Sequence, residues 1–359
     1  MVEFPDNRTH DFLNLAGWGL ADCEPVTGDA STRKYFRLHR DKQTAILMDA
    51  AQNLDSVGPF IQINQHLHQL GFSVPALLAQ DEKNGFLLLE DFGDATFAGL
   101  LDGQLEAISK TSGRAGNPLA IHRSPLPAAS ESENCGAHGV TRPTNAEILY
   151  TLATDVLISL HQNPRAIPAG LRTYHPEKML ADIELFLEWC TPGIDEAGKD
   201  EFRTVWREIL PLAHQVPASL LLRDYHVANL MFLPDREGVR QAGILDFQDA
   251  YQGPITYDLV SLLEDARRDV PDELREKMTA RYLASSTALD RKALETSMAV
   301  LAALRHTRVL AIFERLSRQE GKHDYKQLHS PRVERLLQRA LRHPRLAGVK
   351  RWMERNVDK

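Results

Sequence analysis

At 359 residues the chain is long enough for two or three lobes with their own cores, and its 43% hydrophobic and 25% charged residues are typical of an ordinary globular protein. A formal net charge of −7 gives no indication of a general nucleic-acid-binding surface. The three cysteines are far apart, the N-terminus has no apolar signal-peptide core, and no run approaches 18 apolar residues. We therefore expect reduced thiols, a cytoplasmic location and no membrane span.

The first 90 residues predict a small lobe that combines strands with one long helix. A short helix is expected at 8–20, and a hairpin over 24–38 turns at Gly28, Asp29 and Ser31. Further strands are predicted at 44–49, 74–79 and 85–89, and a helix at 56–70. This pattern predicts an N-terminal lobe at 1–90, followed by a connection and a first helix of the next lobe at 91–102.

The segment 103–143 is rich in Gly, Ser, Pro and Ala and has no visible period, which predicts a mobile insertion. Apolar residues at helical spacing resume after it. The expected helices cover 145–162, 176–190, 199–214, 256–268, 272–285, 290–318 and 331–341, with a short hairpin at 219–247. The region 144–359 is thus predicted to be a mainly helical lobe, and the fold class is α+β.

Three polar residues at strand ends form the most informative pattern in the chain. Asp224 lies in a loop after an apolar run, Asn229 follows five residues later at a strand start, and Asp246 ends a second apolar run. A carboxylate in a loop can accept the proton of an attacking hydroxyl, while an amide oxygen and a second carboxylate can hold Mg²⁺ on phosphates. The alternative is two acidic turns in a hairpin.

The local sequences around these residues resemble kinase motifs. The stretch Leu222 to Asn229 resembles the kinase catalytic loop, with Leu222 in place of its histidine, and Asp246-Phe-Gln248 resembles the metal-binding D-F-G. The following Gly-Pro and Tyr-Asp-Leu resemble the signature of aminoglycoside phosphotransferase-like small-molecule kinases, and an Ala-Pro-Glu element is missing. This resemblance implies a bilobal protein-kinase-like fold with a small β-rich N-lobe, a helical C-lobe, and ATP and Mg²⁺ as cofactors.

The same resemblance assigns expected roles to residues of the small lobe and its connection. The hairpin at 24–38 is similar to the family's nucleotide-covering hairpin, and 87–93 is similar to its hinge, where backbone groups meet adenine. The expected nucleotide-binding residues are Ser31, Thr32, Arg33, Lys34, Leu89, Glu90, Phe92 and Met231. Leu89 and Met231 are equally plausible as core residues. Asp258, in the first turn of its helix, is expected to bond backbone amides there or to brace the catalytic loop.

One departure from the kinase pattern concerns the phosphate clamp. Kinases of this fold usually place a lysine on the third strand, paired with a glutamate on the following helix. Here Met48 occupies the lysine position, and the helix at 56–70 contains no Glu. Either Arg33 or Lys34 substitutes for the lysine, or nucleotide binding is weak or lost.

The third strand and the Gly-Asp-Ala-Ser hairpin turn resemble the bacterial anomeric N-acetylmuramate/N-acetylglucosamine kinases of cell-wall recycling. The resemblance covers nearly the whole chain except 103–143, and it implies a small-molecule sugar substrate. The expected substrate-binding residues are Arg223, Asp249, Glu184, Trp189, Arg305 and Arg308. For Glu184 and Trp189, a structural role in a helix core is the simpler interpretation.

Arginines in the predicted helix 290–318 give independent support for an anionic substrate. Arg305, Arg308 and Arg315 fall within about 80° on a helical wheel. Leu301 and Ile312 share that face, so we expect it to be partly buried, and its arginines need anionic partners. The partners are either acidic residues of neighbouring helices or a substrate carboxylate such as the lactyl group of muramate.

Two other functions stay open at the sequence level. One keeps the fold but changes the acceptor to an aminoglycoside, choline or an amino acid. The other is a non-catalytic nucleotide-binding scaffold, which the missing lysine suggests and the retention of Asp224, Asn229 and Asp246 opposes. The oligomeric state is left open.

Overall fold

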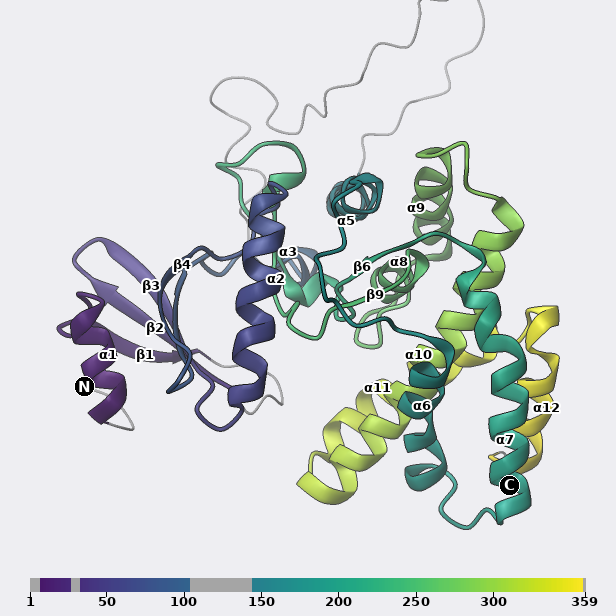
Figure 1. The fold of residues 1–359 in the computed structure, drawn as a ribbon. Coiled ribbons are helices and arrows are strands. Elements are labelled where there is room, and N and C mark those ends of the chain that lie inside the picture. Colours follow the sequence, from purple (N-terminus) through teal and green to yellow (C-terminus); the bar gives the residue numbers. More distant parts are fainter. Residues whose placement is uncertain (1–6, 27–32, 104–143, 358–359) are drawn as a thin grey trace, which may run out of the picture.

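The computed structural model describes residues 7–26, 33–103 and 144–357. These residues form a small lobe around a five-stranded antiparallel sheet and a larger, mainly helical lobe (Figure 1). The predicted α+β, bilobal architecture is therefore confirmed. The predicted insertion lies outside the described residues except at its first position, as do the hairpin residues Ser31 and Thr32.

The small lobe is a sheet with one helix on each face. Its strands are β1 (Asp22–Val26), β2 (Lys34–Arg40), β3 (Gln43–Asp49), β4 (Leu77–Asp81) and β5 (Phe86–Glu90), in the order β1-β2-β3-β5-β4. Alternation along β3 sends Leu47 to a core with α1 (Asn7–Leu15) and Met48 to a core with α2 (Val57–Gln69). In Figure 1, α2 lies between the sheet and the helical lobe. Met48 therefore faces the side on which the two lobes meet.

The helical lobe is centred on one long helix. Its helices are α3 (Phe97–Leu101), α5 (Asn145–Gln162), α6 (Pro176–Trp189), α7 (Glu196–Ile209), α8 (Thr256–Leu263), α9 (Asp272–Ala284), α10 (Arg291–Glu320), α11 (His323–Ala340) and α12 (Ala347–Asn356). Helix α10 contacts α6, α8 and α11. By length and composition α10 could cross a membrane, but 78% of its apolar window is buried inside the protein, as expected for a core helix.

Short strands in the helical lobe carry the polar motifs and dock them against the small lobe. The hairpin β7 (Leu230–Phe232) and β8 (Ala242–Ile244) is tied down because the Phe232 amide donates to the Ala95 carbonyl (2.7 Å) and the Ile244 amide to the Ser73 carbonyl (2.8 Å). Directly after β8, the buried Phe247 ring packs 5.0 Å from the ring of Phe60 on α2. These contacts hold the segment around Asp246 beneath the small lobe.

The structure departs from the expected elements in a few places. The predicted hairpin at 219–247 is wrong in part, because β6 (Ala218–Leu221) pairs with β9 (Tyr251–Pro254) and only β7 and β8 form a hairpin. Helix α8 ends at Leu263, five residues before its expected end, and α11 begins at His323 with Pro331 inside it. Helix α12 was not expected.

Candidate active site

The loop after β6 is held in a strained conformation by a buried carboxylate. Asp258 is fully buried in the first turn of α8, and it accepts hydrogen bonds from the amides of Leu222 (2.6 Å) and Arg223 (2.9 Å). Burial raises the pKa of Asp258 to about 7, although the two amide bonds act in the opposite direction. Of the two expected roles for Asp258, bracing the catalytic loop is the one the structure shows.

The described chain has three non-glycine residues with positive φ, and two of them lie in this site. They are Arg223 (φ 68°) and Asp246 (φ 57°); the third is Asp41. Such backbone strain persists only where surrounding contacts determine it, and it gathers at functional sites. The strained residues flank the polar side chains that the motifs singled out.

The structure brings Asn229 and Asp246 together beside the Asp224 loop. The Asn229 side-chain amide donates to the backbone carbonyl of Asp224 (2.9 Å) and lies 3.4 Å from Asp246 Oδ2, while Gln248 donates to Asp246 Oδ1 (2.8 Å). Asp246 keeps 41% of its side chain exposed. The amide nitrogen of Asn229 is thus used within the protein, which leaves its oxygen for a cation. A carboxylate and an amide oxygen are hard ligands that fit Mg²⁺.

A cation reaches Asp246 from the small lobe. Arg33 Nη2 lies 3.3 Å from Asp246 Oδ1, and the Arg33 side chain is only 9% exposed. Tyr35 pairs with Met48 across the β2–β3 ladder, and Arg33 has the same strand parity as Tyr35. Arg33 therefore lies on the sheet face of the missing lysine, whereas the exposed Lys34 points to the other face.

The hinge residues expected to meet a nucleotide base surround the β7–β8 hairpin. Leu89 and Met231 are buried, at 4% and 3% exposure. Glu90 forms an ion pair with Arg236 (2.6 Å), whose guanidinium lies 5.0 Å from the centre of the Phe92 ring. The structure places these residues at the junction of the lobes, and their contact with a nucleotide stays a prediction.

Arg223, the residue before Asp224, is the centre of a second polar cluster. Its guanidinium donates to Asp182 Oδ2 on α6 (2.9 Å) and lies over the rings of Tyr174 and Tyr251, 4.9 and 5.2 Å from their centres. Asp182 also accepts hydrogen bonds from Lys178 and from the Tyr174 hydroxyl. Burial by itself raises the pKa of Asp182, but Lys178 and the nearby arginines outweigh this and lower it.

The two expected arginines of α10 lie at different depths. Arg305 is buried, with its Nη1 atom lacking a hydrogen-bond partner among the described residues, whereas Arg308 is partly exposed. Burial of the Arg308 guanidinium lowers its pKa, but Tyr257 and the Asp224 carboxylate are among the groups that outweigh this and raise it. Arg308 therefore has an electrostatic interaction with the loop that bears Asp224.

The remaining expected substrate residues have less evident roles. Glu184 forms an ion pair with Arg203 of α7 (2.6 Å), and Trp189 packs against the core of the helical lobe. Asp249 is exposed three residues after Asp246. The sequence interpretation missed Asp182, although its position four residues after Lys178 on a helix is a recognisable ion-pair spacing.

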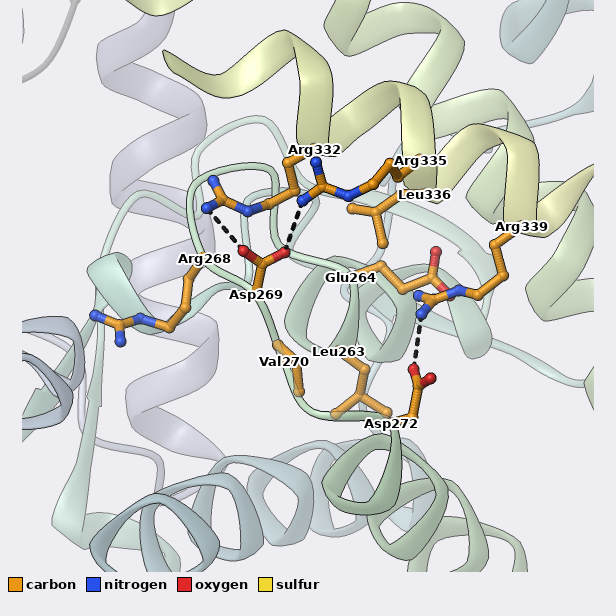
Figure 2. Close-up of a pocket in the computed structure, with 10 residues that line it drawn as sticks. All are labelled: Leu263, Glu264, Arg268, Asp269, Val270, Asp272, Arg332, Arg335, Leu336 and Arg339. Atoms are coloured by element: carbon orange, nitrogen blue, oxygen red, sulfur yellow. Dashed lines mark hydrogen bonds and ion pairs between the residues drawn. The ribbon is translucent and has the colours of Figure 1, made fainter.

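A cavity away from the Asp224 loop is lined by ion pairs. It measures about 280 Å³ and lies between the segment after α8 and helix α11. Figure 2 shows Arg332 and Arg335 converging on Asp269, and Arg339 on Asp272. None of the expected site residues lines this cavity.

The chain is similar to known kinases in sequence and in fold. An N-acetylmuramate/N-acetylglucosamine kinase of Caulobacter vibrioides is 31% identical over 96% of this chain and 95% of its own length, and one of Pseudomonas aeruginosa is 29% identical over 96% and 92%. Among solved structures, a choline/ethanolamine kinase family protein of Mesorhizobium loti superposes with a TM-score of 0.59 at 14% identity, covering 95% of this chain and 96% of that one.

A GDP complex of an aminoglycoside 2'-phosphotransferase also gives a TM-score of 0.59, at 15% identity over 94% of this chain and 99% of that one. At such identities the structures show a shared fold, which is the expected kinase-like one. The model of the phosphotransferase enzyme family matches residues 22–295. The chain belongs to the phosphotransferase enzyme family.

Proposed function

We propose that this protein is an ATP-dependent sugar kinase that transfers the γ-phosphoryl group to the anomeric hydroxyl of N-acetylmuramate or N-acetylglucosamine. The observation that carries the proposal is the convergence of Asn229 and Asp246 beside the braced loop that bears Asp224. The names of relatives at 26–31% identity over most of the chain support the choice of sugar.

In the proposed reaction Asp224 orients the acceptor hydroxyl and takes its proton. The hydroxyl oxygen forms a bond to the γ-phosphorus as the bond to the β–γ bridging oxygen breaks, and ADP leaves. Asn229 and Asp246 would hold Mg²⁺, which supplies positive charge to the phosphates when bound. Asp258 keeps the Asp224 loop in its strained conformation, so the carboxylate needs little reorganisation before transfer.

The nucleotide side of the proposal uses Arg33 in place of the missing lysine. Arg33 contacts Asp246, so the cation lies where phosphates and Mg²⁺ would meet. Leu89, Glu90, Phe92 and Met231 would line the base, with Ser31 and Thr32 contributing from the hairpin turn. This arrangement opposes the scaffold alternative, because a cation does face the metal-binding carboxylate.

Coupled ADP-release assays with N-acetylmuramate, N-acetylglucosamine, aminoglycosides, choline and amino acids test the substrate class. We expect turnover with the two sugars, and none with the methyl glycoside of N-acetylglucosamine, which lacks a free anomeric hydroxyl. Turnover of the methyl glycoside would refute the anomeric position. Activity restricted to an aminoglycoside or choline would refute the sugar assignment.

The variant Asp224→Asn tests the proposed base. It retains the shape of the side chain but cannot accept the proton, so we expect a loss of turnover of at least about 100-fold. Binding of Mg-ATP, measured as a thermal shift, should stay close to that of the wild type. Wild-type-like turnover would remove Asp224 from the mechanism, and a wild-type protein stabilised by Mg-ATP without any ADP release would favour a scaffold.

A further inference from the structure

The acceptor side of the site holds more positive than negative charge. Four cations cluster there: Arg172 and Arg223 both lie over the ring of Tyr251, Lys178 shares Asp182 with Arg223, and Arg308 acts on the same cluster. Asp182 is the carboxylate that pairs with this cluster, and Asp224 acts on the charges of Arg223 and Arg308. Because Asp224 has the acceptor hydroxyl as its proposed partner, the balance favours an acceptor with a negative charge.

Asp182 has most of its hydrogen-bonding capacity taken up within the protein. It accepts hydrogen bonds from Arg223, Lys178 and Tyr174. A carboxylate has about four lone-pair positions, so little capacity is left for another guanidinium. Asp182 therefore neutralises Arg223, which is buried and stacked on aromatic rings, and holds it in place.

Like the exposed Arg172, the partly buried Arg308 has no such anionic partner among the described residues. Within the described parts of the chain Arg308 forms no ion pair and no hydrogen bond, whereas Arg318 of the same helix pairs with Glu314. Its guanidinium nitrogens are not sealed from solvent, unlike the buried Nη1 of Arg305. A partly buried guanidinium pays a desolvation cost that an anionic partner would offset.

Arg308 also lies at the right place to meet an acceptor. It belongs to α10, which packs against α6 and α8, and both Asp224 and Tyr257 act on its charge. A hydroxyl at Asp224 and an anion at Arg308 can therefore belong to one small molecule. A guanidinium binds a carboxylate through two parallel hydrogen bonds, which gives directional recognition.

We infer that Arg308, backed by the Asp182–Arg223 pair, is the receptor for the carboxylate of an acidic sugar and makes this kinase prefer N-acetylmuramate over N-acetylglucosamine. The inference rests on the proposed function and adds a selectivity determinant to it. The same cations repel amino sugars with several ammonium groups and choline, which distinguishes this site from those of structural relatives that are named after such acceptors.

The test compares the two sugars in Arg308→Met, Arg308→Lys and the control Arg318→Met, because Arg318 is exposed on the same helix and pairs with Glu314. We expect Arg308→Met to lower kcat/KM for N-acetylmuramate about 10- to 100-fold and that for N-acetylglucosamine less than about threefold. Arg308→Lys should recover part of the loss, and Arg318→Met should leave both values unchanged.

Equal losses for both sugars, or no loss for either, would overturn the inference. Failure of the proposed function has a different signature, because the wild type would then phosphorylate neither sugar. In that case calorimetric titration decides between the outcomes: binding of N-acetylmuramate that exceeds that of N-acetylglucosamine and disappears in Arg308→Met supports the carboxylate subsite. Equal binding of the two sugars by wild type and variant refutes it.

Discussion

Replacing Arg33 with methionine tests whether this arginine performs the role of the missing lysine. Arg33 Nη2 lies 3.3 Å from Asp246 Oδ1, and methionine keeps the length and apolar stem of the side chain while removing its charge. If Arg33 moves from Asp246 to the phosphates when Mg-ATP binds, its loss weakens nucleotide binding. We therefore expect Arg33→Met to raise the KM for ATP.

The structure sets the scale of the effect. A hydrogen bond to a charged group contributes about 1.5–3 kcal/mol, which corresponds to a rise in KM of roughly 10- to 100-fold. The effect on folding should be much smaller. The Asp246 side chain is 41% exposed, and ion pairs with that much solvent contribute about 0–1 kcal/mol. The variant should therefore unfold close to the wild-type temperature.

The assay measures ADP release at varied ATP with saturating Mg²⁺ and sugar. Lys34→Met is the matched control, because Lys34 is the next residue, is exposed, and points to the other face of the sheet. An unchanged KM in Arg33→Met, or an equal rise in both variants, would refute the substitution of Arg33 for the lysine. A large fall in melting temperature would show that the contact with Asp246 is mainly structural.

Two further predictions concern buried groups. The amides of Leu222 and Arg223 donate to the two oxygens of Asp258, and in Asp258→Asn one of them loses its acceptor. We expect the free energy of unfolding, measured in urea, to fall by about 1–3 kcal/mol, together with a lower kcat. Unchanged values of both would contradict the bracing role. Burial lowers the pKa of His161 to about 3, so below about pH 6.5 the unfolded state binds the proton that the folded state excludes, and stability falls as the pH falls. Between pH 7 and pH 5 this contributes a loss of about 2 kcal/mol, and His161→Gln should show a smaller loss over the same range.

The helices and strands with strong local patterns could be predicted from the sequence. The helix at 145–162 has the predicted bounds, because its apolar residues repeat at helical spacing and Thr144 caps its first turn. Strand β9 could not be foreseen in this way. Its sequence contains Gly253 and Pro254, which indicate a turn, and it exists because β6 pairs with it. A Cβ atom at Gly253 would lie 2.6 Å from Leu221 Cδ1, so a larger residue there would force the buried Leu221 side chain to shift.

Tertiary contacts also set helix ends that local patterns place elsewhere. Periodicity extends α8 to residue 268, but Glu264 ends the helix, accepts a hydrogen bond from His306 of α10 and forms an ion pair with Arg339 of α11. The expected helix begins at Pro331, a residue type that fits the first turn of a helix. In the structure it lies inside α11, where packing along α10 outweighs the lost backbone hydrogen bond.

Some residues of the site could likewise be singled out from the sequence, and others could not. Motif spacing identified Asp224, Asn229 and Asp246, because five residues of loop and one hairpin fix their relation in the chain. A helical wheel grouped Arg305 with Arg308 but could not give their depth, since depth depends on how α6 and α8 pack on α10. Asp182 has no motif. Its role depends on a contact with Arg223, which is 41 residues away in sequence.

The sheet explains how the phosphate-facing charge can change its position in the sequence and keep its position in space. Met48 and Tyr35 are direct partners on neighbouring antiparallel strands, and Arg33 precedes Tyr35 by two residues, on the same face. Strands are about 4.8 Å apart and two residues span about 6.6 Å. A long arginine side chain at position 33 can therefore reach the space that a lysine side chain at position 48 would occupy. Its contact with Asp246 shows that the guanidinium does extend to the floor of the site. A methionine at position 48 can then pack against α2 without an unpaired charge, and this accounts for the absence of a glutamate on α2.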